Sequence, residues 1–291
     1  KSLLNDKVNE MNKGVELWKK AKKMIPGGNQ LLSKRSEMFL PDHWPSYYSK
    51  AKGAEVWDLD GNRYIDMCIM GIGACPLGYA DPDVNEIIQE AVKNGSMCTL
   101  NCAEEVYLAD ELMRLHPWAD MARFARCGGE SMAIAVRIAR ARTRRDKVAF
   151  CGYHGWQDWY LAANLADDSS LDGHLLPGLD PAGVPRGLIG TSVPFRYNHF
   201  EELERINDST PGGLAAIVIE PVRDHDSPWL PRICEGACHK DWGCVNRRRG
   251  LVGIPPEHGG GTPPEGDGAR HSSIRQSDGE WLSNRGDHRT L

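Results

Sequence analysis

The chain has 291 residues, 41% of them hydrophobic and 26% charged, which is ordinary composition for a soluble globular protein with a sizeable core. A formal net charge of −5 argues against nucleic acid or an anionic membrane as a general partner. The absence of any run of about 18 apolar residues predicts no transmembrane helix, and the charged start lacks the apolar core of a signal peptide.

The first 66 residues predict a helix and a hairpin. Apolar residues recur at helical spacing over residues 3–24, and Pro26-Gly27-Gly28 is a helix stop. From Lys50 the pattern changes to period two, and Asp60-Gly61-Asn62 lies between two alternating runs. Asp-Gly in that setting is a strong signal for a β-hairpin. We assign this hairpin a structural role only.

A glycine-rich loop over residues 71–79 leads into two predicted helices and a strand. It is no dinucleotide fingerprint, because no third glycine opens the following helix. Asp81 should cap a helix over residues 84–93. A second helix, over residues 104–115, ends before Pro117 and leads to a strand over residues 122–125.

The chemically most informative stretch begins at Gly128 and Gly129, which precede a helical pattern. Its apolar positions follow the i, i+3, i+4, i+7 rule: Met132, Ala135, Val136 and Ala139. Glycines at a helix start let backbone N–H groups approach an anion closely, and the helix dipole favours negative charge there. A phosphate is the natural ligand, although such a pair also occurs in plain turns and caps.

Residues 147–151 read as a buried strand that delivers Tyr153, His154 and Gly155 to a loop at its carboxyl end. Ligands bind at that edge of open α/β sheets. An anion cradle beside a flat aromatic ring and an imidazole suits a planar phosphorylated cofactor.

The rest of the ordered pattern is an irregular excursion over residues 167–194, a helix over 201–206 and a continuous apolar strand over 215–219. Such a strand is typical of a buried parallel sheet. It ends in Glu220, which is either an ordinary strand-end carboxylate or part of the site.

Nine cysteines without a disulfide framework indicate reduced thiols and a cytoplasmic location. One cluster contains Cys234, Cys238, His239 and Cys244. It lacks paired C-x-x-C spacing, so we predict no metal site.

The runs Gly128-Gly129-Glu130, Arg137-Ile138-Ala139-Arg140 and Tyr153-His154-Gly155 resemble the class III pyridoxal-phosphate aminotransferases, most closely the glutamate-1-semialdehyde 2,1-aminomutase branch. The resemblance implies the fold type I large domain, α/β with a mostly parallel central sheet. It also implies pyridoxal 5'-phosphate as cofactor, a small-molecule amino donor and acceptor, and a homodimer.

By the same resemblance, Gly128 and Gly129 would hold the phosphate, Tyr153 would stack on or edge the ring, and His154 would support it. Glu220 would face substrate or cofactor. The family usually has Ser-Gly-Thr-Glu-Ala where this chain has residues 127–131, Cys-Gly-Gly-Glu-Ser, so two side-chain hydroxyls are absent or moved.

The resemblance stops near Val245. The chemistry needs a lysine that forms a Schiff base with the cofactor and a carboxylate that pairs with its ring nitrogen. Residues 246–291 contain no lysine and no apolar periodicity, and Lys240 precedes the expected carboxylate strand on the wrong side. No catalytic residue is therefore assigned.

Codons for Ala269 to Arg289 can be chosen so that a one-base shift restores the family's lysine segment, with the lysine codon straddling Gln276 and Ser277. We interpret residues 246–291 as the family's gene read in another frame, from a sequencing error or a pseudogene. A basic tail that binds nucleic acid through Arg247, Arg248 and Arg249 is the weaker reading.

Three regions follow from this interpretation: an N-terminal helix and arm (1–50), a partial large domain (51–245) and a disordered tail (246–291), with the small C-terminal domain missing. The predicted function is pyridoxal-phosphate-dependent amino-group transfer, as a transaminase or a 2,1-aminomutase, with this chain inactive for lack of its lysine. The alternative is a non-catalytic, dimerising protein that binds no cofactor tightly.

Overall fold

The computed structural model describes residues 12–68, 70–71, 73–117, 119–174 and 178–220, and the backbone of residues 251–253, 273–277 and 280–283. The chain forms two compact units, residues 1–101 and 102–291. The boundary between them lies about fifty residues beyond the predicted end of the N-terminal arm at residue 50.

Helix α2 (Lys13–Met24) opens the described part of the first unit. Its cap is Asn12, whose side chain accepts a hydrogen bond from the Val15 N–H. Trp18 is buried on the inner face of the helix. The predicted stop is confirmed: Gly28 has a φ of 82°, and a Cβ there would lie 2.6 Å from the Trp18 ring. Residues 3–11 of the predicted helix lie outside the described part of the chain.

The predicted hairpin is confirmed as part of a three-stranded antiparallel sheet with the order β1-β2-β3. Its strands are β1 (Tyr48–Lys52), β2 (Glu55–Asp58) and β3 (Arg63–Ile65). The Asp58 carboxylate closes the turn, because it accepts hydrogen bonds from the Asp60 N–H, from the Asn62 N–H and side chain, and from the Tyr64 hydroxyl. The N–H of Lys13 donates to Asp60 at 3.0 Å, so helix α2 and the hairpin share one unit.

Helix α3 (Pro82–Asn94) completes the first unit, and the predicted cap is confirmed: the Asp81 side chain accepts from the N–H groups of Asp83 and Val84. None of the residues of α3 is buried. Three short 3-10 helices follow α2 along the chain: Pro26–Gly28, Leu32–Lys34 and Ser36–Met38.

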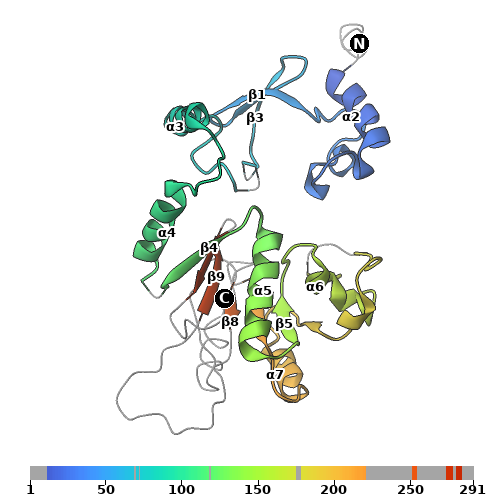
Figure 1. Cartoon of the computed structure of the whole chain (residues 1–291). Helices are drawn as coiled ribbons and strands as arrows, with labels where there is room; N and C mark the ends of the chain where they lie inside the picture. Colours follow the sequence, from blue (N-terminus) through green and yellow to red (C-terminus); the bar gives the residue numbers. More distant parts are fainter. Residues whose placement is uncertain are drawn as a thin grey trace. The chain divides into compact units, whose positions relative to one another are not determined.

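The second unit contains a seven-stranded sheet with the order β4-β10-β9-β8-β7-β5-β6 (Figure 1). Its helices are α4 (Ala103–Leu115), α5 (Gly128–Thr143), α6 (Asp158–Leu161) and α7 (Phe200–Asp208), with short 3-10 turns at Ala162–Leu165 and Arg186–Leu188. Its strands are β4 (Met121–Phe124), β5 (Val148–Cys151), β6 (Ser192–Pro194), β7 (Ala216–Ile219), β8 (Leu251–Gly253), β9 (Ser273–Ser277) and β10 (Glu280–Ser283).

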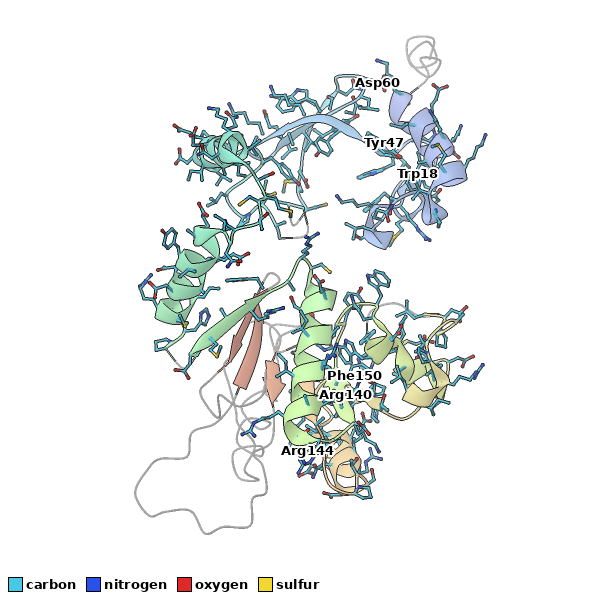
Figure 2. The ribbon with its side chains drawn as sticks, in the orientation of Figure 1. Trp18, Tyr47, Asp60, Arg140, Arg144 and Phe150 are labelled. Atoms are coloured by element: carbon cyan, nitrogen blue, oxygen red, sulfur yellow. The ribbon has the colours of Figure 1, made fainter. Side chains whose placement is uncertain are left out.

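The parallel part of the sheet is β6-β5-β7, where Val148 pairs with Ser192 on one side and Ala216 on the other. Helix α5 lies against the sheet (Figure 1). The predicted apolar stripe of Met132, Ala135, Val136 and Ala139 is buried in the core cluster that also contains β5 and β7 residues. Phe150 of β5 is fully buried in the same cluster, and Figure 2 shows it in the same part of the unit as Arg140 of α5.

Two features differ from the predictions. The excursion over 167–194 was expected to hold little regular structure, yet it ends in strand β6, which pairs with β5. Pro194 is compatible with β6 because this strand lies at the edge of the sheet.

The second difference concerns residues 246–291, which were expected to form a disordered tail but contribute β8, β9 and β10. Their ladders with each other, with β7 and with β4 are all antiparallel, so the expected mostly parallel sheet is parallel only in β6-β5-β7. For β9 and β10 the physical reason is the length of their connection, because two residues can join antiparallel strands whereas a parallel pair needs a crossover of a dozen or more.

Within the described ranges, no helix has the length and apolarity needed to cross a membrane. Over the same ranges, no group of three or more His, Cys, Asp or Glu side chains is arranged to hold a metal ion. The cysteine and histidine cluster at 234–244 lies outside them.

Candidate functional site

The first turn of helix α5 has backbone donors for which the described residues provide no partner. Cys127 precedes the helix in an extended conformation, and the first N–H bonded within the helix is that of Ser131, which donates to the Cys127 carbonyl at 3.0 Å. The N–H groups of residues 128–130 therefore have no partner inside the helix. The Glu130 carboxylate turns back and accepts from the Arg126 N–H at 2.8 Å. Free N–H groups and the positive end of the helix dipole together favour an anion here.

The loop after β5 packs directly on this turn. Gly155 has a φ of 100°, and a Cβ there would lie 2.7 Å from the Gly129 Cα. The Gln157 carboxamide covers both glycines, because a Cβ on either would overlap it. Glycine is thus required at Gly155, where the obstacle is the backbone of Gly129, whereas at Gly129 only the flexible Gln157 side chain stands in the way.

Tyr153 belongs to the same loop as Gly155, two residues before it. Partial burial raises the pKa of its hydroxyl, and the nearby Cys127 at the helix start raises it further. The ring packs edge-on against Tyr160, with centroids 5.7 Å apart and an interplanar angle of 83°. Tyr153 keeps 40% of its surface exposed.

His154 lies beneath the loop rather than on its surface, with 6% of its area exposed. Its Nε2 is 2.8 Å from the Cys151 carbonyl, which can only accept, so Nε2 carries the proton. Burial lowers the pKa of His154 to about 4, and charge repulsion from His174 acts in the same direction. The imidazole is therefore neutral at pH 7 and packs among Phe150, Trp159 and Tyr160.

Glu220 follows β7 and lies next to Gly152 at the start of the loop after β5. Its N–H donates to the Cys151 carbonyl at 3.0 Å, which continues the parallel pairing of β5 with β7. A Cβ on Gly152 would lie 2.7 Å from Glu220 Oε2, so the carboxylate stands beside the start of the loop. The carboxyl ends of the two neighbouring strands thus meet where open α/β sheets bind ligands.

The sequence analysis missed four residues of this cluster. Gln157 covers the glycines, and the Ser131 hydroxyl is fully buried with no hydrogen-bond partner among the described residues. His174 and Tyr160 hold the backbone of Gly152. Two of the four had a signal: Ser131 carries a hydroxyl within the motif at residues 127–131, and Gln157 is a polar residue two positions after Gly155. The contacts of His174 and Tyr160 depend on the folded path of the chain.

The expected carboxylate strand at 242–245, Lys240 and the arginines at 247–249 lie outside the described residues. The site as described therefore consists of the start of α5, the loop after β5 and the end of β7.

Comparisons with known proteins agree on one family. The model of the class III aminotransferase family matches residues 41–225. The glutamate-1-semialdehyde 2,1-aminomutase of Desulfovibrio desulfuricans is 33% identical over 75% of this chain and 50% of its own length.

Two solved structures are similar as well. An omega-transaminase from Sphaerobacter thermophilus is 26% identical, with a TM-score of 0.64 over 78% of this chain and 52% of its own. A transaminase with PLP bound is 30% identical, with a TM-score of 0.59 over 73% of this chain and 48% of its own. This chain spans about half the length of the curated relatives it matches.

The expected fold is thereby confirmed as the large domain of a fold type I, pyridoxal-phosphate-dependent transferase. The chain belongs to the class III aminotransferase family.

Proposed function

We propose that the protein to which this chain corresponds transfers an amino group with pyridoxal phosphate, between a small-molecule amino donor and an acceptor or between neighbouring carbons of one molecule. The observation that carries the proposal is the meeting of three features in one place: the free N–H groups of α5, the half-exposed ring of Tyr153 and the carboxylate of Glu220. Relatives of this chain include both transaminases and 2,1-aminomutases.

The described residues fit the phosphate and the ring of the cofactor. Gly128 and Gly129 carry no side chain at the helix start, and an anion there would displace the flexible Gln157 carboxamide. The buried hydroxyl of Ser131, which has no hydrogen-bond partner among the described residues, adds a further polar group in the same turn. Tyr153 would contact the ring, and His154 would hold the loop from below as a neutral imidazole. When bound, pyridoxal phosphate supplies an electron sink for a carbanion next to the transferred nitrogen.

The covalent attachment does not fit this chain. The last lysine of the sequence is Lys240, and none follows in the segment where the attachment lysine is expected. We propose that a change of reading frame near Val245 removed that lysine together with the carboxylate that pairs with the ring nitrogen. The nucleotide sequence around codon 245 tests this, because a one-base insertion or deletion must be found there.

The remaining expectations belong to the same proposal. A homodimer is supported by helix α3, none of whose residues is buried. Its apolar side chains are exposed: Val84, Ile87, Ile88 and Val92. A cytoplasmic location is supported by the six described cysteines, which are all free thiols. Neither nucleic acid nor a membrane is proposed as partner.

The test is a titration of the purified chain with pyridoxal phosphate, followed by the fluorescence of the tryptophans near the loop. Unphosphorylated pyridoxal serves as the matched ligand. We expect weak, saturable binding that needs the phosphate, and, after borohydride reduction, no lysine that is modified more by pyridoxal phosphate than by pyridoxal. The chain should also gain thermal stability with the phosphorylated ligand, since a ligand that binds only the folded state stabilises it.

Two other results of this titration would each contradict one part of the proposal. Equal binding of both ligands, or none at all, would overturn the phosphate site and favour the second candidate, a non-catalytic protein that keeps only the fold. The absence of the lysine favours that candidate. A reduced adduct confined to a single lysine, formed with pyridoxal phosphate but not with pyridoxal, would instead show that the attachment function survives.

A further inference from the structure

The excursion, which runs from the 3-10 turn at Ala162–Leu165 to strand β6, is anchored to the core of the second unit. Leu171 is fully buried and belongs to the same core cluster as Phe150. The N–H of Leu171 donates to Asn164 Oδ1 at 2.9 Å, and the Asn164 amide donates to the Leu179 carbonyl at 2.7 Å. These anchors give the described part of the excursion a fixed position from which it can act on its neighbours.

His174 extends from this excursion to the loop after β5. Its side chain is buried, and its ring centroid lies 5.6 Å from that of Phe150. Nδ1 of His174 accepts the Gly152 N–H at 3.1 Å. The Gly152 carbonyl in turn accepts the Tyr160 hydroxyl at 3.2 Å. Two buried side chains from different segments thus hold both polar backbone atoms of one residue.

The backbone conformation of Gly152 sets the path of the loop after β5. Its φ of 95° lies in the left-handed region, which other residues rarely adopt. A Cβ there would lie 2.5 Å from the Cβ of Glu220, so the backbone of Gly152 contacts that side chain directly. Tyr153 follows immediately. Any rotation of the Gly152 backbone therefore moves the tyrosine ring relative to Glu220.

We infer that His174 is a positioning residue of the site: by accepting the Gly152 N–H it fixes the loop that presents Tyr153 beside Glu220. The inference deepens the proposed function and depends on it for what the loop binds. The geometry of the loop is independent of that function. The excursion contributes no described residue to the start of α5. Through His174 it would nevertheless set the position of the Tyr153 ring.

A pair of substitutions separates this role from general packing. His174→Leu removes the acceptor and leaves a buried N–H unpaired, whereas His174→Asn places an amide oxygen close to the position of Nδ1. Asp172→Ala is the matched control, since Asp172 accepts the Gly178 N–H at 2.9 Å within the same excursion and makes no described contact with Gly152.

The first readout is hydrogen exchange of the peptide covering residues 152–156 in the full chain without ligand. We expect exchange to rise about tenfold or more in His174→Leu, because an unsatisfied buried N–H costs the loop its closed state. His174→Asn and Asp172→Ala should stay within about threefold of the original chain. If His174→Leu fails to fold, Tyr160→Phe releases the other polar atom of Gly152 and should raise exchange in the same peptide.

The second readout is the affinity for pyridoxal phosphate, measured by tryptophan fluorescence. We expect it to weaken about tenfold in His174→Leu and to be restored by His174→Asn. Equal effects of Leu and Asn, or an effect of Asp172→Ala as large as that of Leu, would overturn the inference. If the original chain does not bind the ligand while exchange follows the expected pattern, the proposed function fails and the positioning role stands.

Discussion

His154 illustrates how a residue read from the sequence as part of a ligand site can act from below the site. Its imidazole is buried among aromatic rings and donates to the Cys151 carbonyl, so its contribution is to the shape of the loop. The sequence predicted its place at the strand end correctly. Its depth could not be predicted, because it depends on Phe150, Trp159 and Tyr160 closing around it.

The lowered pKa of His154 predicts acid sensitivity. The folded chain holds it at about 4, below the ordinary value of 6.5, so as pH falls from 6.5 to 4 the unfolded chain binds the proton first. The free energy of unfolding should therefore decrease over that window, by about 2 kcal/mol at pH 5 from this residue.

The measurement is urea unfolding at pH 7 and pH 5. His154→Gln keeps an N–H that can donate to the Cys151 carbonyl but cannot be protonated, so it should lose about that much less stability on acidification. The same pH dependence in both proteins would show that other groups dominate.

At the scale of elements, the contact between the start of α5 and the loop after β5 brings the residues of the candidate site together. This contact is possible because β5 pairs in parallel with β7, and because Gly129 and Gly155 have no side chains that would keep the helix and the loop apart. The sequence predicted α3, α4, α5, α7, β5 and β7 to within a few residues, because each has strong periodicity or a local cap. The anchors of the excursion could not be predicted, because each joins a side chain to backbone across a segment without periodicity.

Two glycines of this contact should tolerate alanine differently. In Gly155→Ala the new Cβ meets the backbone of Gly129 at a positive φ, so neither side can yield. We expect a loss of about 1 to 3 kcal/mol in unfolding free energy. In Gly129→Ala the obstacle is the flexible end of Gln157, and alanine favours the helix by up to about 1 kcal/mol, so the net change should be small.

Denaturant unfolding of both variants, followed by circular dichroism, decides between these expectations. Equal losses in the two proteins would mean that the loop does not rest on the helix as described.

At the scale of the whole molecule, each unit must be considered on its own. The first unit exposes the apolar face of α3, and the second includes strands from residues 251–283 that no sequence pattern predicted. Those strands have little periodicity, so their place in the sheet depends on the open edges of β7 and β4 rather than on their own sequence. Family membership was readable from short motifs, because glycines and aromatic residues at a ligand site are fixed by local geometry.

The proposed homodimer predicts that a charge on the apolar face of α3 weakens self-association. Ile87 is 70% exposed on that face, and burying a charge in its place would be costly. Ile87→Glu should therefore shift the sedimentation profile toward monomer. Gln89→Glu adds the same charge on the opposite side of the helix and should leave the profile unchanged. Identical profiles for both variants would exclude α3 from the interface.

The turn between β2 and β3, which the Asp58 carboxylate closes, has a consequence for the order in which the chain folds. Among the described residues, every donor to the Asp58 carboxylate lies within six residues of it along the sequence. Such short-range contacts form in about 1 to 10 microseconds, whereas synthesis adds about 5 to 20 residues per second. The β2–β3 hairpin can therefore close on the ribosome, long before translation reaches the codons at which the reading frame is proposed to change.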